Sequence, residues 1–144
     1  MFEKILYPTD FSDVAKKALN YIMQLKEGGA KDVLIFHVID ERGVEAVVHY
    51  APGRTVAVEK KMREDAMQEI RSIEKQLKER GFKVESRVTV GIPLREILNI
   101  EEKEDISVIV LGSHGKSNLE EMFLGSVSEK VIRKCKRPIL VIKR

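Results

Sequence analysis

Four short stretches of the chain consist almost entirely of apolar, often β-branched residues. They span residues 5–7, 33–38, 108–111 and 139–142. Continuous apolar runs of this length are typical of strands buried on both faces of a parallel sheet. A fifth stretch, residues 82–90, alternates apolar and polar positions, which predicts a strand with one more solvated face.

Helical periodicity fills most of the segments between these strands. Apolar residues recur at steps of three and four from Met62 to Leu77, and Gly81 follows as a helix end. Three further helices are predicted, one capped by Ser12, one opening at Pro93 and one beginning near Ser126.

The segment from Asp40 to about Val56 has no clean period. It contains Gly43, Pro52 and Gly53 among a few apolar residues. Because long connections in compact domains often serve a function, we interpret this segment as a mobile or functional loop.

The alternation of strands and helices predicts an α/β fold. Parallel strands need crossover connections, and these are right-handed, so the order implies a doubly wound five-stranded parallel sheet with helices on both faces. The 144 residues provide one core of ordinary size, and we expect a single domain over residues 1–144. Ligands of such sheets gather at the carboxyl ends of the strands.

Composition narrows the compartment and the class of partner. The 26 Lys and Arg and 23 Asp and Glu are interleaved, and the basic run at residues 133–137 lies at a helix end, so nucleic acid is not an expected partner. The lone Cys135 cannot form an intramolecular disulfide, which fits a reducing compartment. We find neither a signal peptide nor an apolar stretch of membrane-spanning length, and expect a cytoplasmic protein without a membrane partner.

Glycines are concentrated after the strand at residues 108–111. Gly112 and Gly115 have no Cβ, so a phosphate can approach their backbone N–H groups, and Gly125-Ser126 adds a helix N-terminus, which favours anions. Ser126 and Glu129 also form a capping-box pattern that needs no ligand, so Ser126 has two interpretations.

Two common nucleotide motifs do not fit. Gly112 and Gly115 are separated by two residues, whereas a P-loop has four between its glycines, and no GxGxxG follows the first strand.

The spacing Gly112-x2-Gly115-x9-Gly125-Ser126 resembles the ATP-binding signature of the universal stress protein family. Three further segments resemble that family in the same order, residues 5–12, 37–40 and 90–93. The resemblance covers nearly the whole chain. It implies an adenine nucleotide alpha-hydrolase-like sheet with strand order 3-2-1-4-5, and a role in the stress response.

The resemblance also implies an ATP site. The backbone of Val38 would read the adenine edge, while the nucleoside would contact Pro8, Thr9 and Asp10, the Asp10 carboxylate facing the ribose hydroxyls. Leu111 and Gly112 would flank the sugar and the α-phosphate. The β- and γ-phosphates, with Mg²⁺ or Mn²⁺ bound through them, would be held by Gly115, Gly125, Ser126 and Val127.

Several of these residues have a simpler interpretation. Asp10 can instead begin the turn before the helix cap at Ser12. His37, inside an apolar run, is interpreted as a core residue with a satisfied ring rather than as a ligand. His114 and Lys116 can touch phosphate or face water.

The sequence is compatible with three functions. The resemblance implies binding with little or no hydrolysis, hence a nucleotide-dependent regulatory switch acting on an unknown protein partner. The second is a weak ATPase or phosphotransferase that uses Ser113, His114 or Lys116, although the sequence contains no kinase signature. The third is a nucleotide-free interaction scaffold.

A homodimer is expected as well. If the last strand lies at a sheet edge, the run from Ile139 to Ile142 exposes unpaired backbone, which proteins normally cover. Pairing with the same strand of a second copy covers it, and the family resemblance implies a dimer of this kind.

Overall fold

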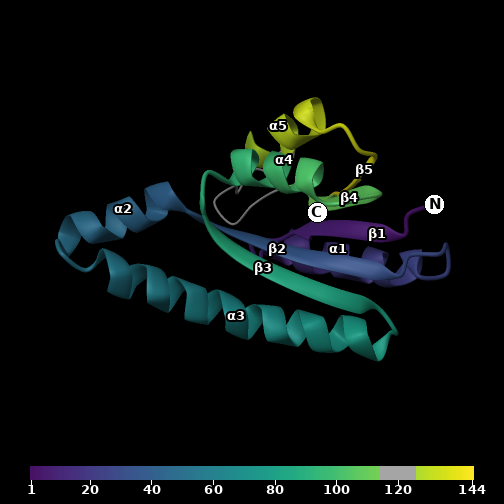
Figure 1. Cartoon of the computed structure of the whole chain (residues 1–144), viewed down its shortest axis with the longest axis horizontal. Helices are drawn as coiled ribbons and strands as arrows, with labels where there is room; N and C mark the ends of the chain where they lie inside the picture. The colour runs from purple at the N-terminus through teal and green to yellow at the C-terminus, as the bar shows by residue number, and fades with distance from the viewer. Residues whose placement is uncertain (114–125) are drawn as a thin grey trace.

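The computed structural model describes residues 1–113 and 126–144. Five parallel strands form one sheet in the order β3-β2-β1-β4-β5, as expected (Figure 1). The strands are β1 (Lys4–Pro8), β2 (Asp32–Asp40), β3 (Lys83–Gly91), β4 (Val108–Gly112) and β5 (Ile139–Ile142). The helices are α1 (Asp13–Leu25), α2 (Glu41–Tyr50), α3 (Thr55–Glu79), α4 (Pro93–Lys103) and α5 (Ser126–Lys134).

Helices cover both faces of the sheet because consecutive strand residues point to opposite sides. Ile5 and Tyr7 pack with α1 and α3 on one face, whereas Leu6 packs with α4 and α5 on the other. The same alternation in β2 and β4 produces two apolar layers, one above and one below the sheet. The doubly wound fold predicted from the unbroken apolar runs is confirmed.

Local signals begin and end the helices where expected. The Ser12 hydroxyl accepts a hydrogen bond from the Ala15 N–H at 3.2 Å and caps α1, and Pro93 is the first residue of α4. After α3, Gly81 adopts a φ of +87°, a left-handed conformation that favours glycine.

The segment after Asp40 was predicted as a loop, and this is wrong for most of its length, because residues 41–50 form α2. The Asp40 carboxylate caps this helix by accepting a hydrogen bond from the Arg42 N–H at 3.0 Å. Val44 is the only buried residue of α2. Val44, Val47 and Val48 do recur at helical steps, but this short period stands between Gly43 and Pro52-Gly53, which indicated a loop. Helix α2 packs on α3, and the two helices extend beyond the sheet (Figure 1).

The edge strand β5 is held in place by a buried carboxylate. Glu101 is 2% exposed and accepts hydrogen bonds from the backbone N–H groups of Lys136 and Arg137, each at 2.6 Å. These bonds fix the turn that leads from α5 into β5. The prediction that the last strand lies at an edge of the sheet is confirmed.

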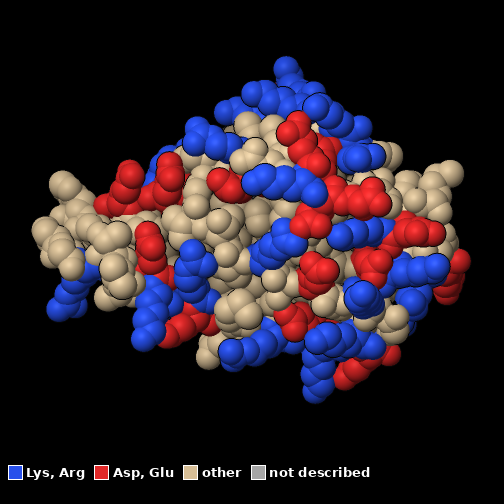
Figure 2. Space-filling view, in the orientation of Figure 1, with Lys and Arg blue, Asp and Glu red and all other residues tan. Residues whose placement is uncertain are grey.

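Charged side chains are interleaved over the face in Figure 2, with Lys and Arg gathered over α5 at the top. Arg133 pairs with Glu129 at 2.8 Å, and Lys136 pairs with Glu102 at 3.0 Å. Basic residues in the last turn of α5 complement its helix dipole, as expected. Among the described helices, none combines the length and apolarity needed to cross a membrane.

Candidate functional site

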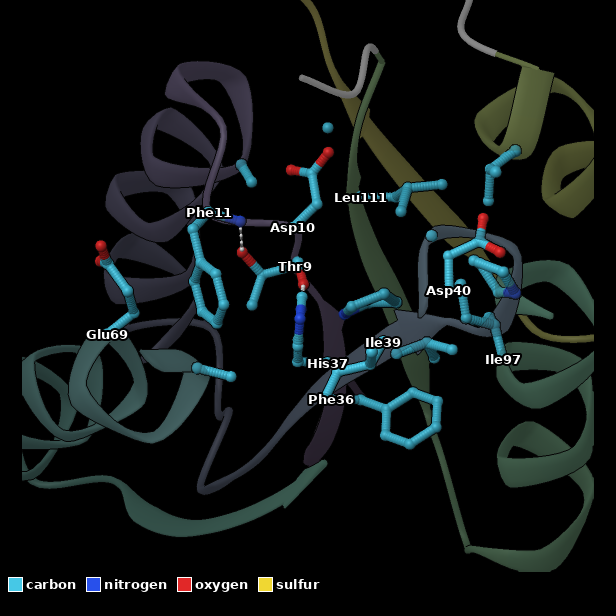
Figure 3. A pocket seen from close by; sticks show the side chains of 18 of the residues that line it. Thr9, Asp10, Phe11, Phe36, His37, Ile39, Asp40, Glu69, Ile97 and Leu111 are labelled. Atoms are coloured by element: carbon cyan, nitrogen blue, oxygen red, sulfur yellow. Dashed lines mark hydrogen bonds between the residues drawn. The ribbon is translucent and has the colours of Figure 1, made fainter. Parts of the chain in front are cut away.

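A pocket of about 1200 Å³ opens at the carboxyl ends of β1, β2 and β4 (Figure 3). β1 is the point where the strand order reverses, since the connection through α1 leads to β2 on one side and β4 lies on the other. Doubly wound sheets bind their ligands in the crevice at such a point. The volume exceeds the roughly 300–1000 Å³ of typical small-molecule sites, so a nucleotide-sized ligand fits.

Most of the predicted site residues meet in this pocket. Its lining includes Pro8, Thr9, Asp10, Val38, Leu111, Gly112, Ser126 and Val127. The other two predicted residues, Gly115 and Gly125, lie outside the described residues, as do His114 and Lys116.

The backbone of β2 turns its polar groups toward the pocket at Val38. Asp32 N–H donates to Glu3 O at 3.0 Å and Thr9 N–H donates to Phe36 O at 2.9 Å, so the even-numbered residues of β2 face β1. In a parallel pair this alternation continues along the strand. The N–H and C=O groups of Val38 therefore face the β1 side, beyond Pro8, where β1 has ended.

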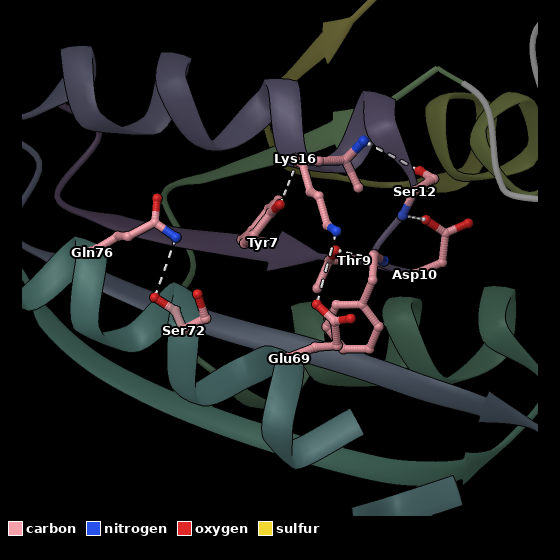
Figure 4. A network of polar contacts seen from close by, with 10 residues as sticks. Tyr7, Thr9, Asp10, Ser12, Lys16, Glu69, Ser72 and Gln76 are labelled. Atoms are coloured by element: carbon pink, nitrogen blue, oxygen red, sulfur yellow. Dashed lines mark hydrogen bonds and ion pairs between the residues drawn. The ribbon is translucent and has the colours of Figure 1, made fainter. Parts of the chain in front are cut away.

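Asp10 belongs to a tight turn between β1 and α1. Its Oδ1 accepts the Ser12 N–H at 3.0 Å, and the Thr9 hydroxyl accepts the Phe11 N–H at 3.0 Å (Figure 4). Phe11 has a φ of +64°, which is rare for a residue with a side chain. The turn interpretation of Asp10 is confirmed, and its carboxylate also lines the pocket, so the two interpretations are compatible (Figure 3).

Gly112 has a structural reason for lacking a side chain. A Cβ at this position would lie 3.0 Å from Val14 Cγ1 and 3.1 Å from the backbone nitrogen of Ala15. Its φ is not positive, since the described glycines with positive φ are Gly29, Gly53 and Gly81. Gly112 thus lets α1 approach β4 closely, whether or not a phosphate binds there.

The first turn of α5 is anchored beside Gly112. The Ser128 hydroxyl is buried and donates to the Gly112 carbonyl at 2.8 Å. Helix α5 begins at Ser126, as predicted, but the Glu129 carboxylate pairs with Arg133 instead of completing a capping box. Backbone N–H groups at a helix start are donors for an anion, so this turn can hold one.

Four carboxylates line the pocket, from Asp10, Asp40, Asp65 and Glu69, and no Lys or Arg is among the described lining residues. Lys61 pairs with Asp65 at 2.9 Å and Lys16 with Glu69 at 3.9 Å. Arg42, hydrogen-bonded to Asp40, holds the pKa of that carboxyl below its usual value. Three of the four carboxylates are thus paired with cations that do not line the pocket, and the described lining offers no basic side chain to a phosphate.

Three features of the pocket were missed or misjudged from the sequence. His37 is half-buried and lines the pocket, although its ring was expected in the core. Asp65 and Glu69 belong to α3, whose apolar period identified only the face packed on the sheet. Ser113, a candidate nucleophile, has an exposure of 0% and does not line the pocket.

The described residues contain no group of three or more His, Cys, Asp or Glu side chains that could hold a metal ion. A cation bound here would need ligand oxygens, such as those of phosphates, to complete its coordination.

The sequence profile of the universal stress protein family matches residues 1–143. The universal stress protein MJ0577 of Methanocaldococcus jannaschii is 42% identical, and the alignment covers 100% of this chain and 96% of that protein. A solved structure of MJ0577 superposes with a TM-score of 0.90 and 44% identity, covering 100% of this chain and 97% of that one.

Two more distant solved structures contain nucleotides. A universal stress protein in complex with cAMP has a TM-score of 0.63 and 22% identity, covering 97% of this chain and 95% of that one. A family member from Arabidopsis thaliana with AMP bound has a TM-score of 0.65 and 17% identity, covering 99% and 92%. At these identities the likeness shows a shared fold.

Proposed function

Because the chain belongs to the universal stress protein family, we propose that it binds an adenine nucleotide, ATP foremost, and acts as a nucleotide-dependent regulatory switch. The observation that carries this proposal is the position of Val38, whose N–H and C=O groups face the pocket beyond the end of β1. Adenine offers a ring-nitrogen acceptor beside an amino donor, which complements one N–H and one C=O group.

The remaining contacts follow from the order of residues around the pocket. With the base against Val38, the ribose reaches Pro8, Thr9 and Asp10, where the Asp10 carboxylate accepts hydrogen bonds from its hydroxyls. Leu111 and Gly112 flank the sugar and the α-phosphate. The β- and γ-phosphates then reach the first turn of α5 at Ser126 and Val127, with Gly115 and Gly125 completing the cradle.

Charge favours a divalent cation in this complex. A triphosphate adds negative charge to a pocket whose described lining has four carboxylates and no basic residue. Mg²⁺ or Mn²⁺ bound through the phosphate oxygens offsets that charge without a dedicated protein site.

Slow or absent turnover is part of the proposal. Phosphoryl transfer needs a placed nucleophile and cationic stabilisation of the transferring group. Ser113 is fully buried, and the described lining contributes no Lys or Arg.

In this proposal, nucleotide binding changes the surface that helix α2 offers to a protein partner. Asp40 and Gly43, at its start, line the pocket, whereas Val47 and Tyr50 farther along are 46% and 89% exposed. A ligand that contacts the start of α2 biases the orientation of this exposed apolar surface, which a protein partner can recognise. We further propose a homodimer through Ile139–Ile142 and a cytoplasmic location.

The test is to denature freshly purified protein and identify the released nucleotide by chromatography, with Gly115→Val as a variant whose side chain blocks the phosphates. ATP in the parent, absent from an equally stable variant and lost on chelation of divalent cations, supports the switch. Bound ADP with metal-dependent phosphate release supports the weak ATPase or phosphotransferase. A chain that purifies empty and shows no thermal shift with added ATP contradicts the proposal and leaves the scaffold.

A further inference from the structure

The hydrogen-bond ladder between β1 and β2 stops one bond early. The ladder runs from Asp32 N–H to Glu3 O and reaches Thr9 N–H to Phe36 O at 2.9 Å. In a parallel pair the next bond in this series joins Val38 N–H to Thr9 O. Both residues are described, and that bond is not formed.

The Thr9 carbonyl is bonded to a side chain instead. His37 Nδ1 lies 2.7 Å from Thr9 O (Figure 3). A carbonyl oxygen can only accept, so Nδ1 carries the proton and donates it. The imidazole thereby takes the acceptor that the ladder would otherwise give to Val38.

Phe11 holds this imidazole in place. The two rings lie 4.5 Å apart between centroids and are inclined by 31°. Phe11 is itself buried, and its N–H is bound by the Thr9 hydroxyl at 3.0 Å. Thr9 therefore links the two residues, because its hydroxyl accepts the Phe11 N–H and its carbonyl accepts the His37 Nδ1–H. The turn and the histidine hold each other in place.

We infer that His37 is a positioning residue, which ends the β1–β2 ladder and so keeps the Val38 N–H available to read the edge of a purine. This inference rests on the proposed adenine site. An adenine ring nitrogen accepts from that N–H, whereas guanine presents a donor at the same ring position. His37 thus supports selection of adenine over guanine without touching the base.

Two substitutions of similar shape distinguish the effect of the donor nitrogen from the effect of the ring. His37→Asn keeps a nitrogen donor on Cγ, as in the imidazole, while His37→Leu has the same branching and no donor. Both remove the contact with Phe11, so any difference between them reports the bond to Thr9 O. Ile22→Val, at a buried position in α1 packed against the sheet, serves as a control for mild loss of stability.

The first measurement is amide hydrogen exchange at Val38 in the nucleotide-free full chain. We expect fast exchange in the parent and in His37→Asn, and exchange at least tenfold slower in His37→Leu, where Thr9 O becomes available to Val38. Equal exchange rates in the Asn and Leu variants overturn the inference, and they do so whether or not the protein binds nucleotide.

The second measurement compares the Kd values for MgATP and MgGTP by titration calorimetry. We expect the parent, Ile22→Val and His37→Asn to prefer ATP at least tenfold, and His37→Leu to lose that preference through weaker ATP binding with unchanged GTP binding. If His37→Leu keeps the preference, or loses both affinities equally, His37 has only a structural role. If the parent binds neither nucleotide, the proposed function fails, and the exchange experiment still decides the role of His37.

Discussion

Gly112 in β4 lies so close to Ala15 in the first turn of α1 that a Cβ on the glycine would stand 3.1 Å from the backbone nitrogen of Ala15. This contact joins one wall of the pocket to the helix that follows Asp10. Close packing on α1 is therefore a sufficient reason for a glycine that also looks like part of a phosphate cradle.

We expect Gly112→Ala to lower the free energy of unfolding of the nucleotide-free protein by roughly 1–3 kcal/mol, because the methyl group meets backbone that cannot rotate away. Urea denaturation measures the change. Gly43→Ala is the matched control, since a Cβ there meets nothing within 4 Å, and it should stabilise α2 by roughly 0.5–1 kcal/mol. A Gly112→Ala protein as stable as the parent, with only its ATP binding lost, would assign the glycine to the ligand instead.

Asp10→Asn separates the two roles of Asp10. The amide oxygen can still accept the Ser12 N–H, so stability should change by less than about 0.5 kcal/mol. Loss of a charged acceptor for the ribose should weaken ATP binding roughly tenfold or more. Calorimetry with ATP and with 2′,3′-dideoxy-ATP checks this, because the dideoxy analogue should bind the two proteins alike. A similar loss for both ligands would argue against the contact with the ribose.

Tyr7 makes the fold sensitive to alkali. Its side chain is fully buried, its hydroxyl donates to the Ala15 carbonyl, and burial raises its pKa to about 12. Between pH 10 and 12 the unfolded chain loses this proton while the folded chain keeps it, so the free energy of unfolding falls, by about 3 kcal/mol in total. Below pH 10 the contribution is fully present.

Tyr7→Phe should lose about 1 kcal/mol at neutral pH with its hydrogen bond, and should show a smaller decrease in stability from pH 10 to 12 than the parent. Urea denaturation across this range measures both effects. Tyr50→Phe is the control, because Tyr50 is 89% exposed and should leave the alkaline profile unchanged. Identical alkaline profiles for the parent and Tyr7→Phe would refute the buried-phenol explanation.

The edge strand β5 offers a test of the dimer. Leu140 is 36% exposed on this strand, so Leu140→Glu should place two carboxylates against each other across a symmetric interface and produce monomers. Light scattering at micromolar concentration measures the mass. Val47→Glu, on exposed α2, should remain dimeric. A parent protein that is already monomeric would contradict the proposed interface.

Much of the fold could be predicted because its signals are local. Unbroken apolar runs identified four strands, and Ser12 and Pro93 marked helix starts that the structure confirms. Helix α2 escaped prediction because its apolar period, Val44, Val47 and Val48, is short and is flanked by Gly43 and Pro52-Gly53, which indicated a loop.

The sequence by itself determined the order of strands and helices, the end of the sheet at which the pocket lies, and the family, since each depends on residue patterns read along the chain. The tertiary structure alone decided which helix faces complete the pocket, how closely Gly112 packs on α1, and which groups the His37 ring contacts. Those depend on where β1 stops relative to β2, on how closely α1 approaches β4, and on the bond from His37 to Thr9. Such distances join residues remote in sequence, and no local pattern encodes them.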